Sequence, residues 1–215
     1  IKKCIICGNE DFKVFLRCRD HFLSGKEFNI QECKNCGFRF TNPRPDEKDL
    51  GQYYESEEYI SHSNSQKGLL NSIYQKVRKY TLQKKFKLIC KYKRQGKILD
   101  IGCATGEFLN VFKKHKWKVH GIEPNDSARS FAINNYGIEV VKEAELNSYK
   151  NNDFDVITMW HVLEHVAQLD LRLKQLKRLL KLNGFLFVAV PNCNSFDAKI
   201  YKEFWDAYDV QRHRY

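Results

Sequence analysis

Short apolar runs alternate with longer amphipathic stretches through the second half of the chain. Five of the runs are rich in β-branched and aliphatic residues and are predicted as strands: 97–102, 117–123, 137–141, 154–160 and 184–190. Helical or mixed stretches such as 107–115 separate them. Because strands that alternate with crossover helices build a parallel sheet with helices on both faces, the pattern predicts an α/β fold.

The clearest helical pattern covers residues 169–184. One face of this predicted helix is apolar and contains Leu169, Leu173, Leu176 and Leu180. The pair Asn183-Gly184 is a typical helix stop, so we expect the helix to end there.

The pattern divides the chain into three regions. Residues 1–42 contain aromatic-rich segments, of which 12–18 and 27–33 are predicted to pair as a hairpin, and they end at the proline turn "TNPRP". Residues 43–95 have a helical pattern and form a bridge, and residues 96–215 contain the α/β domain. Within the bridge, one apolar stripe is predicted to be buried: Leu69, Leu70, Ile73, Val77 and Tyr80.

Composition is that of a folded protein. The chain has 215 residues, of which 42% are hydrophobic, so it can bury a sizeable core and carry a small appendage. No apolar run approaches the roughly 18 residues of a membrane span, and the first residues lack the apolar core of a signal peptide. We therefore expect a cytoplasmic protein with no membrane span.

The positive charge is concentrated in one segment. The net charge is +11, and residues 67–97 contain 11 Lys or Arg and no Asp or Glu. One interpretation is the solvated face of a lysine-rich helix. The other is an electrostatic collar that attracts an anionic substrate, such as a phosphorylated metabolite, a nucleotide-sugar or RNA.

Two CxxCG units stand near the start of the chain, and their four cysteines are Cys4, Cys7, Cys33 and Cys36. Each unit can form a knuckle in which both thiolates reach one metal, so the two pairs complete a tetrahedral Zn²⁺ site that is structural. The alternatives are two disulfides or free buried thiols, and a reducing cytosol disfavours disulfides. Cys18 is a reserve ligand, and the isolated cysteines are predicted as ordinary buried thiols: Cys90, Cys103 and Cys193.

The stretch "KILDIGCATGEFL", residues 97–109, is a strand, a glycine turn and a helix start. A dinucleotide fingerprint needs glycine at its sixth position, whereas here Gly102 is followed by Gly106 at the fifth. Asp100 would repel a pyrophosphate and favours a cationic group. Glu123, at the end of the next predicted strand, can accept hydrogen bonds from both ribose hydroxyls. S-adenosylmethionine offers a ribose and a cation without a pyrophosphate.

Four segments together resemble the class I S-adenosylmethionine-dependent methyltransferases, especially the group of ubiquinone-biosynthesis and sugar methyltransferases: "ILDIGCATGEFL", "HGIEPN", "FDVITMWHVLEHV" and "LLKLNGFLFVAVPN". The resemblance covers residues 96–192 and implies a Rossmann-like, mostly parallel sheet. Several members of the group carry a cysteine-rich zinc-binding segment ahead of the catalytic domain. The family's sheet has seven strands and this sequence supplies five, so the resemblance implies that the last two are missing after Tyr215.

The resemblance also implies roles for individual residues. It places Asp100, Gly102 and Gly106 around the methionine part of the cofactor, with Ala104 where the family usually has a glycine. It assigns the ribose hydroxyls to Glu123. It implies that the remaining cofactor contacts come from Pro124, Ala144 and Glu145 around the adenine, and from Met159, Trp160 and His161 beneath the sulfonium.

Two histidines are candidates for acid–base chemistry. His161 and His165 are four residues apart and would share one face if they begin a helix. Either can accept a proton near neutral pH, as methyl transfer to a protonated acceptor requires. The alternative is that they cap or pack the strand-to-helix junction. His213 is a further group that could face the substrate.

These observations predict an S-adenosylmethionine-dependent methyltransferase acting on O, N or C of a small or carrier-linked metabolite, such as a sugar. The acceptor is anionic if the basic segment is an electrostatic collar, and the helix-face interpretation stays the alternative. A second hypothesis is RNA methylation, in which the basic segment grips phosphates. A third is a non-catalytic zinc-ribbon adaptor that retains the cofactor-binding fold. The sequence gives no indication of the oligomeric state.

Overall fold

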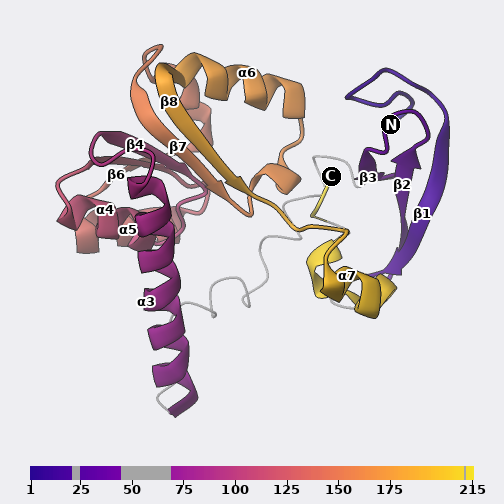
Figure 1. The fold of residues 1–215 in the computed structure, drawn as a ribbon, viewed down its shortest axis with the longest axis horizontal. Coiled ribbons are helices and arrows are strands. Elements are labelled where there is room, and N and C mark those ends of the chain that lie inside the picture. Colours follow the sequence, from indigo (N-terminus) through magenta and orange to yellow (C-terminus); the bar gives the residue numbers. More distant parts are fainter. Residues whose placement is uncertain (21–24, 45–68, 211) are drawn as a thin grey trace. The chain divides into compact units, whose positions relative to one another are not determined.

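The computed structural model of the chain describes residues 1–20, 25–44, 69–210 and 212–215 (Figure 1). It divides the chain into two compact units, each described by itself below. The larger unit contains residues 66–163 and 171–189. The smaller unit contains residues 1–65, 164–170 and 190–215.

The larger unit is built on a five-stranded parallel sheet. Its strands are β4 (Lys97–Ile101), β5 (Lys118–Ile122), β6 (Glu139–Val141), β7 (Phe154–Trp160) and β8 (Leu180–Ala189). They lie in the order β6-β5-β4-β7-β8, and every neighbouring pair is parallel. The prediction of an α/β fold from five strands is therefore confirmed. The strand order reverses at β4, which is where ligands bind in open sheets of this kind.

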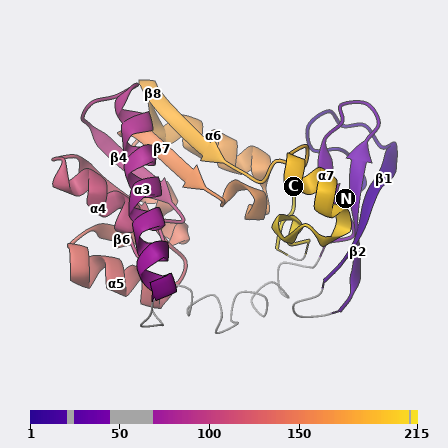
Figure 2. The same cartoon turned by 60° about the horizontal axis from the view of Figure 1, so that its bottom comes forward.

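Helices cover both faces of this sheet. They are α3 (Leu69–Cys90), α4 (Glu107–Lys114), α5 (Asp126–Tyr136) and α6 (Leu169–Leu179). Figures 1 and 2 show α4 and α5 on one side of the sheet and α6 on the other. The short 3-10 helices η2 (Glu143–Ser148) and η3 (Leu163–His165) follow β6 and β7.

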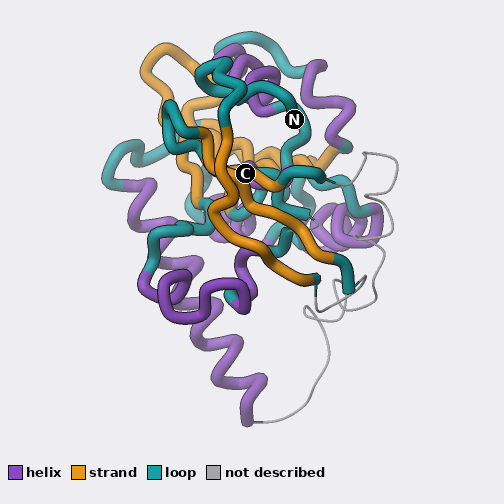
Figure 3. Tube along the Cα trace, turned by 90° about the vertical axis from the view of Figure 1, so that its right-hand side faces the viewer, coloured by secondary structure: helices purple, strands orange, loops and turns teal. Residues whose placement is uncertain are grey.

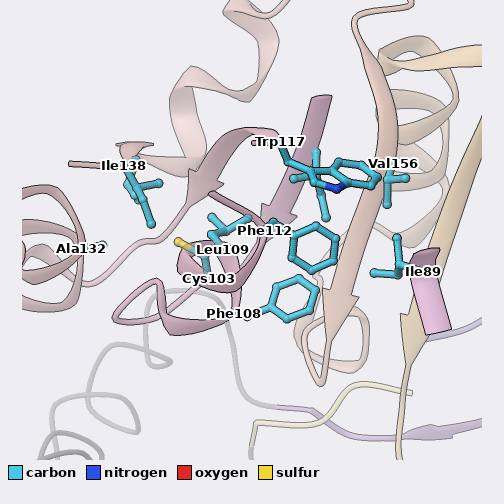
Figure 4. Close-up of a cluster of buried hydrophobic side chains, with 11 residues drawn as sticks. Ile89, Cys103, Phe108, Leu109, Phe112, Trp117, Ala132, Ile138 and Val156 are labelled. Atoms are coloured by element: carbon cyan, nitrogen blue, oxygen red, sulfur yellow. The ribbon is translucent and has the colours of Figure 1, made fainter. Parts of the chain in front are cut away.

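Aromatic side chains fill the core beneath α4 (Figure 4). Phe112 is 0% exposed, and its ring centroid lies 5.1 Å from Trp117 and 4.9 Å from Phe108. Ile89 of α3 and Val156 of β7 belong to the same cluster. Apolar side chains of β7 and α4 therefore pack against each other, because burial of apolar surface stabilises the fold.

Three residues of the apolar stripe predicted to be buried in the basic helix are exposed, and the side chains of the other two, Leu69 and Leu70, lie outside the described part. Ile73, Val77 and Tyr80 are 52%, 56% and 60% exposed. The packed residues come later in α3: Phe86 lies 4.9 Å from Phe112 between ring centroids, and Ile89 is 0% exposed. The physical reason is that the first half of α3 extends away from the sheet, as Figures 1 and 3 show.

The predicted helix stop at Asn183-Gly184 is also wrong. α6 ends at Leu179, and the chain enters β8 directly at Leu180, which pairs with Phe154. The pairing then shifts, and a Cβ on Gly184 would lie 2.8 Å from the Leu180 side chain. This glycine therefore serves a close approach within β8. The buried side chains of α6 are Arg172, Leu176 and Leu179, whereas Leu173 is exposed.

The smaller unit contains an antiparallel sheet. Its strands are β1 (Phe12–Arg19), β2 (Glu27–Cys33) and β3 (Arg39–Thr41), in the order β1-β2-β3. The pairing of β1 with β2 confirms the predicted hairpin. The later elements are α7 (Phe196–Tyr201), η4 (Lys202–Phe204) and η5 (Asp206–Tyr208).

Residues 190–215 also belong to the smaller unit. Val210 is buried in one cluster with Cys18, Phe28 and Ile30 of the sheet. The compact units are therefore discontinuous in sequence, whereas the predicted regions 1–42, 43–95 and 96–215 are continuous, and those boundaries remain a proposal. The helical pattern predicted within 45–68 lies outside the described residues. Among the helices that the structure describes, none is long and apolar enough to cross a membrane.

We expect Phe112→Ala to lower the free energy of unfolding of the larger unit by about 3–5 kcal/mol, because it opens a cavity among packed rings. Urea unfolding followed by tryptophan fluorescence measures this loss. The control is Phe131→Ala on α5, whose side chain is 36% exposed, with an expected loss below about 1 kcal/mol. Equal losses in the two variants would contradict the packing described here.

Candidate functional site

The turn between β4 and α4 is held in a conformation that favours glycine. Gly102 and Gly106 have φ of 75° and 77°. A Cβ on Gly102 would lie 2.4 Å from Val162 Cγ2, and one on Gly106 would lie 2.9 Å from Ala132 Cβ. The two glycines are thus required both by backbone conformation and by space.

Ala104 departs from the expected glycine but keeps the same backbone conformation. Its φ is 46°, in the left-handed region, which costs a non-glycine residue free energy. Its backbone N–H donates to Glu123 Oε2 at 2.9 Å. Alanine is therefore tolerated at position 104, because the hydrogen bond to Glu123 holds the turn in this conformation.

Glu123 links the turns that follow β4 and β5. Its Oε2 accepts from Ala104, its Oε1 accepts from the backbone N–H of Asn125 at 2.9 Å, and the residue is 3% exposed. Burial raises the pKa of Glu123 although both N–H donors lower it. Each carboxylate oxygen keeps a further lone pair, so two adjacent hydroxyls can still be bound.

Asp100 lies in β4, just before the glycine turn. It is 2% exposed, and Thr158 on the paired position of β7 donates its hydroxyl to Asp100 Oδ1 at 2.5 Å. Burial raises the pKa of Asp100 to about 7, although Thr158 and the charge of Lys85 lower it. A carboxylate of this kind is poised to ionise when a cation binds beside it.

The end of β7 contributes the other predicted residues. Met159 is 0% exposed and lies within the sheet layer. Trp160 stands edge-on to Phe108, and Lys85 places its ammonium 4.1 Å from the Trp160 ring centroid. His161 has φ of 58° and an exposed side chain. Burial and the charge of Lys85 lower the pKa of His161, which keeps it neutral near pH 7.

The adenine candidates follow neighbouring strands. Pro124 is exposed directly after β5, and Ala144 and Glu145 are exposed on η2, after β6. Because the strands are parallel, these residues and the glycine turn lie at the same carboxyl edge of the sheet. The structure thus brings the predicted cofactor residues to one edge of the larger unit.

His161 and His165 would share a face only if they began one helix, and the structure does not meet this condition. η3 covers only Leu163–His165, and α6 begins at Leu169. His165 lies with Glu164 and His213 in a cluster whose ligand atoms are within 4.8 Å of one another. Burial, with the charge of His213, lowers the pKa of His165 to about 4, so its ring is neutral at pH 7.

The four cysteines of the CxxCG units meet in the smaller unit. Their Sγ atoms all lie within 4.8 Å of one another, with Cys4–Cys36 and Cys7–Cys33 separations of 3.6 Å. These separations exceed the S–S bond length of a disulfide, about 2.05 Å. They are close to the distance of roughly 3.8 Å between the sulfurs of a tetrahedral zinc site with Zn–S bonds of about 2.3 Å.

The two CxxCG knuckles have the same backbone geometry. The N–H of Gly8 donates to the carbonyl of Cys4, and the N–H of Gly37 donates to that of Cys33, each at 2.8 Å. Both glycines are left-handed, with φ of 73° and 72°. The residues present therefore fit a four-thiolate metal.

Sequence reasoning missed Thr158, Val162 and Lys85. Thr158 could have been found, because it is the one hydroxyl in the apolar strand "FDVITMW" and its register opposes Asp100. Val162 carries no such signal, and Lys85 is one of 11 basic residues in the segment 67–97, of which the sequence does not single out any one. Their positions depend on how a loop and a distant helix pack against the sheet.

A parallel sheet of this order, with a glycine turn after β4 and buried acids at the ends of β4 and β5, defines the Rossmann-like fold of class I S-adenosylmethionine-dependent methyltransferases. The pattern that describes the methyltransferase-domain family matches residues 62–215. The chain belongs to this family.

Curated relatives share the segment around the site. A ubiquinone biosynthesis O-methyltransferase of Chelativorans sp. (strain BNC1) is 31% identical over 103 residues, which are 45% of this chain and 40% of the relative. The protein of the same description from Haemophilus ducreyi is 34% identical over 107 residues, 45% of each chain. The chain thus covers less than half the length of these relatives.

Among solved structures, a SAM-dependent methyltransferase from Archaeoglobus fulgidus is similar in fold. Its TM-score is 0.50 with 23% sequence identity, and the match covers 62% of this chain and 63% of the other. This likeness supports the fold alone.

We expect Gly102→Ala to lower the free energy of unfolding of the larger unit by about 2–4 kcal/mol. The left-handed φ contributes about 1 kcal/mol and the clash with Val162 the remainder. Chemical denaturation measures it.

Gly137→Ala is the matched control for this prediction. Gly137 has φ of 58°, but its Cβ would meet only the flexible Lys113 ammonium, at 3.1 Å, so the expected loss is about 1 kcal/mol. Adding Val162→Ala to Gly102→Ala should recover the clash component in a double-mutant cycle. If Val162→Ala recovers nothing, the close approach is not present in solution.

Proposed function

We propose that the chain binds S-adenosylmethionine at the carboxyl edge of the larger unit's sheet and takes part in transfer of its methyl group. The observation that carries this proposal is Glu123, a buried carboxylate fixed by two backbone N–H groups, with lone pairs left for two ribose hydroxyls. When bound, the cofactor supplies a methyl group on a sulfonium, which needs no further activation.

The protein's residues position the cofactor and exclude water. Asp100 would hold the ammonium of the methionine part, and the turn from Gly102 to Gly106 would lie next to it. Pro124, Ala144 and Glu145 would border the adenine. Trp160 and His161 stand on the side where an acceptor approaches, and alignment of the acceptor provides most of the rate gain.

His161 is the proposed group that accepts a proton from the acceptor. Its ring is exposed and its lowered pKa leaves it neutral at pH 7, as a base requires. His165, in the smaller unit, stays a proposed proton acceptor from the sequence, and its ring is neutral at pH 7, as that role requires.

The proposed acceptor is a small or carrier-linked molecule methylated on oxygen. The curated relatives are described as O-methyltransferases, which supports oxygen over nitrogen or carbon. An anionic acceptor is consistent with the lysine-rich α3, whereas nothing in the structure supports RNA in preference to a small molecule.

We also propose that Cys4, Cys7, Cys33 and Cys36 hold a structural Zn²⁺. Four protein thiolates leave no coordination position for substrate, so the metal would stabilise the small sheet and take no part in chemistry.

The cofactor site is tested by isothermal titration with S-adenosylhomocysteine. We expect Glu123→Gln to weaken binding on the order of 10- to 100-fold, because one oxygen that accepts from the ribose is replaced by a donor. The control is Glu139→Gln, an exposed acid of β6, which should bind as the unaltered chain does. A folded chain that binds no S-adenosylhomocysteine would contradict the proposed function.

Cofactor affinity should rise with pH up to about pH 7. In the ligand-free chain Asp100 has a pKa of about 7, so below this pH the group must lose a proton before it pairs with the ammonium. Affinity is then expected to fall by up to about tenfold for each pH unit below 7. Titrations between pH 5.5 and 8 measure this slope. The Asp100→Asn variant should bind S-adenosylhomocysteine more weakly and with little pH dependence. If its affinity changes with pH as steeply as that of the unaltered chain, another group causes the pH dependence.

The purified chain should contain one zinc ion, measured by elemental mass spectrometry. Cys36→Ser should lose the metal and lower the melting temperature of the smaller unit, because the thiolates then lack their common ligand. Cys90→Ser, on α3 in the larger unit, is the matched control and should retain full zinc content. Full zinc content in Cys36→Ser would exclude the four-thiolate site.

A further inference from the structure

The outward face of α3 carries an exposed row of apolar side chains. The helix packs on the larger unit's core through Leu82, Phe86 and Ile89. A helix period of 3.6 residues places a second row on the opposite side. The side chains of this outward row are 40–60% exposed: Ile73, Val77, Tyr80 and Leu88. A contiguous apolar row at a surface, rimmed by polar side chains, marks an interaction site.

Exposed lysines accompany the outward row. By the helix period, Lys76 and Lys87 lie along one edge of it. Lys84 lies within the row, with its ammonium 4.7 Å from the centroid of the Tyr80 ring. Residues 67–97 contain no Asp or Glu that could neutralise these charges from within the segment. The row therefore fits a partner that offers negative charge and an apolar region together.

The first half of α3 is placed so that it can reach such a partner. Residues 72–77 and 79–81 are all exposed. Figures 1 and 3 show that this half of the helix extends away from the sheet. The outward row, from residue 73 to residue 88, is about 22 Å long at 1.5 Å per residue. A helix that projects from its own unit in this way can lie along a flat surface.

We infer that α3 binds to the surface of a membrane that contains anionic lipids. The outward row enters the boundary between headgroups and acyl chains, and the lysines lie at the lipid phosphates. The alkyl stem of Lys84 can stay in the apolar layer while its ammonium reaches the phosphates. Tyr80 has the apolar ring and polar hydroxyl that suit this boundary. The helix lies on one face of the membrane and does not cross it.

Other partners fit the outward row less well. RNA offers phosphates to the lysines and bases to tyrosine rings, but it gives no apolar surface to the aliphatic side chains of Ile73 and Val77. A second copy of the chain would bring the same lysines against these, and residues 67–97 contain no acid to pair with them. A membrane with anionic lipids satisfies both the charged and the apolar side chains along the whole row.

The test is flotation of the full chain with lipid vesicles in a density gradient. We expect the chain to float with vesicles of phosphatidylglycerol and phosphatidylcholine in equal parts, and far less with pure phosphatidylcholine. A lysine variant carries three substitutions: Lys76→Gln, Lys79→Gln and Lys87→Gln. It should partition into the anionic vesicles on the order of 100-fold more weakly, at roughly fivefold for each charge.

The matched control for charge removes three exposed lysines of the larger unit that lie outside α3: Lys118→Gln, Lys150→Gln and Lys177→Gln. This control has the same net charge as the lysine variant. Its partition coefficient should fall by less than about tenfold, because charges more than a Debye length from the lipid are screened.

A second variant tests the apolar side chains without a change of charge. Ile73→Gln combined with Val77→Gln should lower partition into the anionic vesicles on the order of 100-fold, because two aliphatic side chains no longer enter the lipid. The control combines Leu171→Gln with Leu182→Gln, at positions outside α3 that are 49% and 96% exposed, and should float as the unaltered chain does. Thermal unfolding checks that each variant is folded.

The inference fails if the folded, unaltered chain floats with neither kind of vesicle. Without flotation, RNA binding that the lysine variant loses would assign the row to RNA, and a dimer that the Ile73→Gln, Val77→Gln variant dissociates would assign it to a second copy. The inference also fails if that apolar variant floats as the unaltered chain does, because charge alone would then explain binding.

The flotation assay contains no cofactor, so it is independent of the proposed function. A chain that floats but does not bind S-adenosylhomocysteine would contradict the proposed function and support the membrane surface. A chain that binds S-adenosylhomocysteine but does not float would do the reverse.

Discussion

The buried carboxylate of Glu123 is the interaction on which the geometry of the larger unit's site depends. It accepts one N–H from the turn after β4 and another from the turn after β5, so it fixes the distance between two segments that the sheet alone would leave free. Without these two bonds a carboxylate that is 3% exposed would carry an uncompensated desolvation cost. The left-handed conformation of Ala104 is maintained by the same contact.

Sequence patterns predicted the elements of the larger unit because each has a strong local cause. The central strands β4 and β7 consist almost entirely of buried residues, and the glycines after β4 occupy positions where a Cβ meets Val162 or Ala132. Asp100 and Glu123 were predicted as site residues because each stands at the end of a predicted strand, and the two strands are joined by one crossover helix. The four cysteines were found because a knuckle needs its two thiolates and its glycine at fixed positions.

The errors concern packing that local sequence does not contain. The stripe with Ile73 and Val77 has good helical spacing, but only the later part of α3 reaches the sheet, so Phe86 and Ile89 pack instead. Asn183-Gly184 has the composition of a helix stop, yet pairing of Leu180 with Phe154 already places these residues in a strand. His161 and His165 are four apart in sequence, but a left-handed residue at 161 and a short 3-10 helix separate them.

The return of the chain's end to its beginning has a consequence for synthesis. The backbone N–H of Thr41 donates to the carbonyl of Arg214, and the N–H of Arg214 donates to that of Glu164. On a ribosome, domains usually fold in the order in which they emerge. Here the first strands emerge early but wait for Val210 and Arg214, whereas the described strands and helices of the larger unit lie before residue 190 and are synthesised before the residues that pack on β1 and β2.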